Sequence, residues 1–303
     1  MSIFIFSDST ADFNSDLLKQ FKDVEFLPLS YSLDDDNYDG IETSLPIEEF
    51  YKRVEAGAVT KTSMTSTYYM EERMTDVLEK GYDVLVDAFS SGLSNQYEGT
   101  LTVVTKLKKK YPERKIETID STLASAGEAL HLYKVLKKRD EGASFEELVQ
   151  YAKELRRHIA SYFTVTDLRH LARLGRCSMV SALIGSIVKI MPVLYVNPLG
   201  KLISYGKVIS RKKAIKALFE KMGEKMIPVE KQDKVFISHA ACLEDAQFLA
   251  SLVKEKYGID AVISDISQVI GAHTSSGCLA FFFECEDRFD SDDKAQYTMD
   301  YSK

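Results

Sequence analysis

Four short segments of the chain are rich in serine and threonine, whose hydroxyls can hydrogen-bond an anion without carrying charge. They are FSDST (6–10), KTSMTS (61–66), SSGLS (90–94) and TIDST (118–122). Three of them follow apolar runs that predict β-strands, and KTSMTS precedes a predicted helix. Strand ends of a parallel sheet share one edge, with helix N-termini beside it. We therefore expect these turns to gather where a carboxylate or a phosphate could bind.

Helix capping explains each of these segments equally well when it is taken alone, because Ser, Thr and Asp are preferred N-cap residues. Capping explains the whole set less well. KTSMTS carries four hydroxyls, and SSGLS carries three around Gly92. A glycine at this position lets another backbone, or a ligand, approach closely.

Four aspartates near the same predicted edge could hold Mg²⁺, which prefers carboxylate ligands. They are Asp8, Asp12, Asp87 and Asp120. Asp8 and Asp120 each begin an Asp-Ser-Thr turn, for which an Asx turn or a cap is the simpler interpretation. The alternative hypothesis of a stand-alone, metal-assisted enzyme acting on a phosphorylated or carboxylated metabolite depends on these carboxylates.

A basic segment, LRHLARLGRCS (168–178), lies near the middle of the chain. We expect Arg169 and Arg173 on a solvated face. Arg176 follows Gly175 in a predicted turn before an apolar helix, where its guanidinium could reach a cleft.

A single histidine lies in the segment GAHTSSG (271–277), which we predict to be a glycine-flanked loop. The apolar strand 278–283 follows it directly. The sequence supports a structural role and a ligand-binding role for His273 equally.

Motifs and composition exclude several classes of protein. The chain contains no GxxxxGK[ST], GxGxxG, HExxH or GxSxG motif. Its five histidines show no metal-ligand spacing, and its four cysteines are far apart with no CxxC, so we expect neither zinc nor disulfides. The net charge of −7 disfavours a nucleic-acid surface. These features favour a cytoplasmic protein.

Two hydrophobic stretches are relevant to membranes. The N-terminus, MSIFIFSDST, lacks the features of a signal peptide. The apolar stretch 179–196 is interrupted by Lys189 and Pro192, so it predicts a buried helix followed by a buried strand rather than a membrane span. We therefore expect no transmembrane segment, which leaves transient contact with a membrane surface as the only membrane interaction.

Short apolar runs alternate with amphipathic stretches along the chain, which is typical of α/β domains. We predict two α/β domains, residues 1–160 with a mainly parallel sheet and residues 161–286, followed by a charged tail at 287–303. The predicted strands are 2–6, 24–33, 84–89, 115–119, 161–166, 201–208, 235–239, 261–265 and 279–285. The predicted helices are 14–21, 46–56, 69–80, 96–110, 124–139, 145–158, 211–226 and 246–257.

Seven motifs occur in the order found in the DegV family, which the chain resembles from residue 3 to about 284. They are SDSTAD (7–12), KTS (61–63), SSGLS (90–94), IDS (119–121), LGRCS (174–178), RKKA (211–214) and GAHT (271–274). Each motif is weak alone, whereas the ordered set is specific.

The resemblance implies a two-domain carrier that encloses one long-chain fatty acid, such as palmitate or oleate, and needs no metal or other cofactor. It places the acyl chain in a tunnel in the C-terminal domain and the carboxylate at the interdomain cleft. It also implies no activity of the carrier itself. A partner fatty-acid kinase uses ATP to convert the presented carboxylate to an acyl phosphate for phospholipid synthesis.

The resemblance also assigns roles to individual residues. Thr62 and Ser63 hydrogen-bond the carboxylate, Ser94 lies close to it, and His273 contacts it directly or through water. Arg176 supports the head-group pocket, and Arg211 with its neighbours docks the kinase. The residues themselves indicate tunnel walls in the apolar segments 180–196 and 279–283. The burial of some fifteen methylenes would contribute roughly 10 kcal/mol and dominate affinity.

Three positions depart from the usual pattern of that family. Thr62-Ser63-Met64-Thr65-Ser66 replaces TSQPS, so a loop proline is missing. Ser275-Ser276 replaces the Gly-Pro that commonly follows GAHT. Asn95-Gln96 replaces the Gly-Thr that usually follows SSGLS. The proposed ligand residues are all retained, while the loops that carry them differ.

Overall fold

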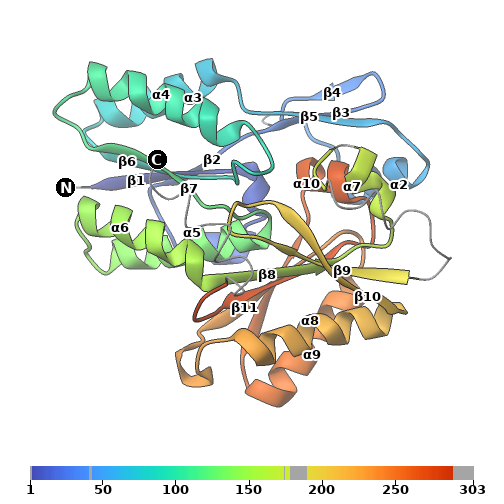
Figure 1. Cartoon of the computed structure of the whole chain (residues 1–303). Helices are drawn as coiled ribbons and strands as arrows, with labels where there is room; N and C mark the ends of the chain where they lie inside the picture. The colour runs from blue at the N-terminus through green and yellow to red at the C-terminus, as the bar shows by residue number, and fades with distance from the viewer. Residues whose placement is uncertain (1, 41–42, 174, 178–189, 289–303) are drawn as a thin grey trace.

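The computed structural model describes residues 2–40, 43–173, 175–177 and 190–288. Its strands form three sheets, here called A, B and C (Figure 1). Sheet A takes its strands from residues 3–120, and sheet C from residues 159–284. The small sheet B lies beside the two larger sheets. This is the α/β architecture that the alternation of apolar runs predicts.

Sheet A is entirely parallel, as we predicted for the N-terminal half. Its strand order is β2-β1-β6-β7. Strand β6 is buried along its whole length, which explains why Val84, Leu85 and Val86 follow one another without polar residues between them. The strands are β1 (Ile3–Asp8), β2 (Val24–Leu27), β6 (Asp83–Ala88) and β7 (Ile116–Asp120).

Helices cover both faces of sheet A. Figure 1 shows α3 and α4 on one face and α5 and α6 on the other. Helix α6 begins with a capping box in which Ser144 and Glu147 satisfy each other's backbone N–H groups. Asn14 caps α1, as expected. The helices are α1 (Ser15–Leu18), α3 (Thr67–Glu79), α4 (Gln96–Lys110), α5 (Ala126–Asp140) and α6 (Phe145–Leu155).

Sheet C is mixed, with the order β10-β9-β8-β13-β11-β12. Only the pair β11 and β12 is parallel among its described pairings. Helices α8 and α9 cover its outer face (Figure 1). The strands are β8 (Ile159–Thr164), β9 (Ile190–Val196), β10 (Leu202–Ile209), β11 (Lys234–His239), β12 (Asp260–Asp265) and β13 (Leu279–Glu284). The helices are α7 (Leu168–Arg173), α8 (Arg211–Lys225), α9 (Leu243–Tyr257) and α10 (Gln268–Thr274).

Sheet B corrects two predictions. The predicted strand 24–33 is two strands in different sheets, because Pro28 lacks the N–H that a continuous ladder needs. The predicted turn 61–66 begins as a strand, which β-branched threonines favour. Sheet B has the order β4-β3-β5, with α2 packed beside it. Its elements are β3 (Ser30–Leu33), β4 (Asp36–Tyr38), β5 (Thr60–Ser63) and α2 (Ile47–Glu55).

Two further predictions concern the segments beside sheet C. Residues 271–274 belong to helix α10 rather than to a loop, so His273 lies in the last turn of a helix. The predicted strand within 179–196 is confirmed as β9. The predicted apolar helix before it, at 179–189, lies outside the described residues, as does most of the tail at 287–303.

One hydrophobic cluster connects the two large sheets. Helix α5 packs against β1 of sheet A and against β8, β11 and β13 of sheet C. Gly127 of α5 permits this approach, because a Cβ atom there would lie 2.6 Å from the ring of Phe282. The division at residue 160 stays a prediction. Its two parts share a core at α5, and residues of both parts can therefore line one site.

In the part of the chain that the structure describes, no helix combines the length and the apolar character needed to cross a bilayer.

Candidate functional site

A cavity lies between sheets A, B and C, and residues on or next to strands of all three sheets line it. Sheet C contributes alternate residues of β8 and β13, whose side chains point to the same face. Helix α10 contributes its apolar stripe. The mainly apolar lining includes Leu29, Phe89, Leu93, Ala124, Phe163, Leu171, Val196, Leu202, Ile266, Val269, Ile270, Cys278, Ala280 and Phe282.

Four of the predicted ligand residues line this cavity together: Thr62, Ser94, Arg176 and His273. His273 Nε2 lies 2.9 Å from Thr62 Oγ1, although 211 residues separate them in the sequence. Arg176 Nε donates a hydrogen bond of 3.4 Å to the carbonyl oxygen of Leu93, the neighbour of Ser94. These four residues therefore give the polar end of a cavity whose other lining residues are mainly apolar.

The Thr62–His273 pair keeps one hydrogen-bond donor for a ligand. A neutral imidazole has one N–H and threonine has one O–H, and their mutual bond uses one of these two donors. If Nε2–H donates to Thr62, the hydroxyl proton remains. If the hydroxyl donates to Nε2, the Nδ1–H remains, and Nδ1 has no partner among the described residues. Either tautomer can therefore donate to a carboxylate oxygen.

His273 is neutral at physiological pH. Burial, and after it the positive charges of Arg176 and His170, lower the pKa of His273 to about 4. At neutral pH the imidazole therefore meets a ligand in its neutral form. Arg176 is exposed and supplies positive charge at the mouth of the cavity.

Two other predicted residues lie elsewhere. Ser63 follows Thr62 on β5, is exposed, and falls outside the set of described residues that line the cavity. Successive strand residues point to opposite faces, which explains why only one of the two reaches the site. Arg211 is the first residue of α8, and its Nε donates to Asp245 at 2.8 Å. Its docking role stays a prediction.

Three of the hydroxyl-rich segments, 6–10, 90–94 and 118–122, share one edge of sheet A, whereas 61–66 begins in sheet B. Most of the hydroxyls at this edge form hydrogen bonds with other protein groups. Ser90 donates to the carbonyl oxygen of Gly200 at 2.9 Å, and Ser91 to Asp120 at 2.6 Å. Gly92 permits the contact with the 197–200 turn, since a Cβ there would lie 2.3 Å from the Leu199 carbonyl oxygen. The turn at 90–94 therefore joins the two halves of the molecule.

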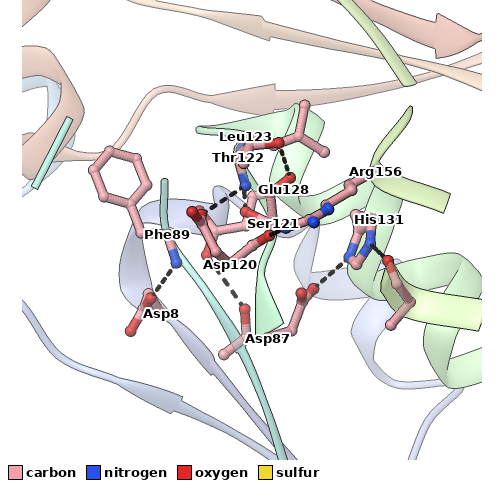
Figure 2. Close-up of polar contacts among 12 residues, drawn as sticks. Asp8, Asp87, Phe89, Asp120, Ser121, Thr122, Leu123, Glu128, His131 and Arg156 are labelled. Atoms are coloured by element: carbon pink, nitrogen blue, oxygen red, sulfur yellow. Dashed lines mark hydrogen bonds and ion pairs between the residues drawn. The ribbon is translucent and has the colours of Figure 1, made fainter. Parts of the chain in front are cut away.

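The aspartates at this edge also form hydrogen bonds with other protein groups. Asp8 accepts from the Phe89 N–H at 2.6 Å, and Asp87 pairs with His131 at 2.9 Å (Figure 2). Asp120 accepts from the N–H groups of Ser91 and Thr122. Among the described residues, no group of three or more His, Cys, Asp or Glu side chains is placed to share a metal ion. The local contacts explain these carboxylates as turn and strand-end acceptors.

A buried hydrogen-bond network around Gln96 holds the loop after Thr62 in place. The side-chain carbonyl of Gln96 accepts from the Thr65 N–H at 3.0 Å, and its amide donates to Asp8 and to Thr65 Oγ1. Thr65 in turn donates to the Pro28 carbonyl at 2.9 Å. A proline at position 65 would lack the N–H that Gln96 uses. We infer that the Gln96 network restrains this loop, as a proline at position 65 would do in the usual family pattern.

We expect Gln96→Ala to lower the free energy of unfolding by about 1–3 kcal/mol, because it leaves buried groups of Asp8 and Thr65 unpaired. Urea unfolding measures the change. Gln150→Ala, at an exposed position of α6, is the control and should change stability by less than about 0.5 kcal/mol. An equal decrease in the free energy of unfolding in the two variants would contradict a stabilising role of the Gln96 network.

A second prediction concerns the pH dependence of stability. Burial raises the pKa of Asp12 to about 7, against about 3.9 in an unfolded chain. Between these values the folded state holds a proton that the unfolded state has lost, so the free energy of unfolding falls as pH rises from about 4 to 7. Asp12→Asn should remove about 2 kcal/mol of this fall between pH 5.5 and 7.5.

Urea unfolding at both pH values tests this expectation. Asp35→Asn, at an exposed position, serves as the control and should keep the wild-type pH profile. An unchanged fall in Asp12→Asn would show that Asp12 does not titrate in this range.

Sequence reasoning missed much of the cavity wall. Ile266, Val269, Ile270 and His273 recur at helical spacing, so this stripe was readable as one face of a helix. The contributions of β8 and of Phe89 were not readable, because they depend on how sheets A and C face each other. Within the predicted wall segment 279–283, Ala280 and Phe282 line the cavity, and the wall's role for an acyl chain stays a prediction.

These features define an α/β protein that encloses an apolar cavity with hydrogen-bonding groups at one end, the class that binds amphipathic small molecules. The family model described as "Uncharacterised protein, DegV family" matches residues 2–286. A DegV domain-containing protein of Clostridium perfringens is 37% identical over 281 residues, covering 92% of this chain and 96% of that protein. The chain belongs to the DegV family.

Solved structures agree with this assignment. A hypothetical protein from Thermotoga maritima, reported to reveal a fatty-acid binding function, matches with a TM-score of 0.79 and 28% identity, covering 94% of this chain and 99% of that one. DegV of Bacillus subtilis, a fatty-acid binding protein, matches with a TM-score of 0.81 and 25% identity, covering 94% and 100%. Both likenesses extend over nearly the whole chain.

Proposed function

We propose that this protein binds one long-chain fatty acid, with its acyl chain in the cavity and its carboxylate at Thr62 and His273. The observation that carries the proposal is the cavity itself, whose mainly apolar lining also includes the Thr62–His273 pair and Arg176. The fatty-acid binding of the Thermotoga and Bacillus relatives supports it. Ser94 lies beside the carboxylate position in this proposal, and the exposed Ser63 has no part in it.

We further propose that the protein is a carrier without activity of its own, which presents the carboxylate to an ATP-dependent fatty-acid kinase. Arg176 lines the cavity and is exposed, which supports the proposal that a partner can reach the bound carboxylate. The docking face would include Arg211 at the start of α8. The product would be an acyl phosphate, formed when the carboxylate oxygen attacks the γ-phosphorus of ATP and ADP leaves.

A reconstitution separates binding from presentation. The oleate-loaded protein is mixed with a bacterial fatty-acid kinase and ATP, and acyl phosphate is trapped with hydroxylamine as the hydroxamate. We expect product only when both proteins are present. Product from the loaded protein and ATP alone would overturn the carrier assignment. Absence of product with a kinase that is active on another carrier would overturn the kinase partnership while leaving fatty-acid binding intact.

A further inference from the structure

Among the described residues, one hydroxyl interrupts the apolar wall that strands β8 and β13 present to the cavity. Four residues of β8 and β13 form this wall: Ser161, Phe163, Ala280 and Phe282. They are paired directly across the two strands, Ser161 with Phe282 and Phe163 with Ala280. Ser161 is 3% exposed, and its Oγ has no hydrogen-bond partner among the described residues.

The other hydroxyls of the cavity have partners. Ser125 Oγ bonds to Asp12 and to Ser238, Thr274 Oγ1 donates to a backbone carbonyl, and Thr62 pairs with His273. Ser94 Oγ accepts from the Gln96 N–H. Ser161 thus differs from its neighbours in holding a hydroxyl that the described protein groups leave unsatisfied.

An unsatisfied buried hydroxyl is unfavourable against a plain hydrocarbon chain, because it has given up water without gaining a partner. Alanine or valine would pack against methylene groups without this cost. A ligand hydroxyl at this depth would remove the cost, since each hydroxyl can both donate and accept.

The position of Ser161 along the wall fixes where such a group would lie. Strand β8 ends toward α7 and Arg176, and β13 begins just after α10 and His273. The pair of Phe163 and Ala280 is therefore nearer the polar end, and Ser161 lies about 7 Å deeper, at roughly 3.3 Å per strand residue. A hydroxyl next to the carboxyl group would not reach it.

We propose that the cavity favours a long-chain fatty acid that carries a hydroxyl group well along its acyl chain, with Ser161 Oγ as its hydrogen-bond partner. This inference rests on the proposed fatty-acid binding and names the substrate class for that site. It makes Ser161 a specificity-determining residue: the Thr62–His273 end selects the carboxylate, and Ser161 selects the second polar group.

Competition between acids tests the inference. Delipidated protein is offered pairwise mixtures of stearic acid with 12-hydroxystearic, 10-hydroxystearic or 2-hydroxystearic acid, and native mass spectrometry counts each complex. We expect the wild type to prefer the 10- or 12-hydroxy acid about 3–10-fold, the range of one net hydrogen bond, and not to prefer the 2-hydroxy acid. Ser161→Ala should lose this preference while still binding stearic acid.

A matched control is Ser264→Ala. Ser264 is also a buried serine whose Oγ has no partner among the described residues, yet it lies on β12, outside the cavity lining. This variant should keep the wild-type preference. A wild type that favours stearic acid over both deeper hydroxy acids, or a Ser161→Ala variant that keeps the preference, would overturn the inference alone. Failure of every acid to bind would overturn the proposed function and the inference with it.

Discussion

Replacing Ala280 with phenylalanine should abolish tight binding of long-chain fatty acids. Ala280 is 6% exposed, lines the cavity from β13, and faces Phe163 across the strand pair. A benzyl group there would occupy space that the acyl chain needs. Exclusion of only four methylenes would cost about 3 kcal/mol, which is roughly 200-fold in affinity.

Calorimetric titration of delipidated protein with palmitate measures this loss, and thermal unfolding shows whether the fold survives. The matched control is Ala217→Phe, which adds the same ring to α8, away from the cavity. We expect palmitate to stabilise the control and the wild type alike, and to leave Ala280→Phe unchanged. Undiminished palmitate affinity in a folded Ala280→Phe variant would place the acyl chain elsewhere.

Removing both donors at the polar end should have the second-largest effect. The Thr62–His273 pair keeps one donor in either tautomer, so each single variant, Thr62→Val or His273→Leu, retains one group that can still donate. The double variant retains none. A hydrogen bond to a charged group contributes about 1.5–3 kcal/mol, so we expect the double variant to bind palmitate roughly 10–100-fold more weakly.

Each single variant should lose less palmitate affinity than the double variant. The double-mutant cycle should therefore show coupling between Thr62 and His273. Hexadecanol serves as the control ligand, because it lacks the carboxylate and should bind wild type and double variant with similar affinity. A second pair outside the cavity lining, Thr102→Val at an exposed position with His158→Leu at a half-buried one, controls for the substitutions themselves. Equal losses for palmitate and hexadecanol would show that the pair supports the fold rather than the carboxylate.

Much of the architecture was predictable because buried faces of strands and helices require apolar residues at a recognisable spacing. Strand β6 carries Val84, Leu85 and Val86 in succession since helices cover both of its faces, and α6 shows both its cap and its apolar stripe. The break at Pro28 was also readable as a missing donor. By contrast, the strand at Thr60–Ser63 and the helix at Gln268–Thr274 were predicted as a turn and a loop. Their Ser and Gly residues are typical of turns, whereas the threonines of the first and the apolar spacing of the second favour the observed elements.

The site was predictable in composition and only partly in geometry. The ordered motifs led to Thr62, Ser94, Arg176 and His273, and these four do line one cavity. The sequence could not show that Ser63 points away, since that depends on β5 being a strand. Nor could it show that most of the hydroxyls at the edge of sheet A bind protein groups. Such contacts depend on the packing of distant segments.

The most direct test of the central claim is native mass spectrometry of the purified protein, followed by denaturation and lipid analysis of an organic extract. We predict a native mass that exceeds the chain mass by one fatty acid, with the same acid recovered in the extract. A chain mass without any excess, unchanged after incubation with palmitate, oleate or hydroxystearic acid, would contradict the assignment of the cavity as a fatty-acid site.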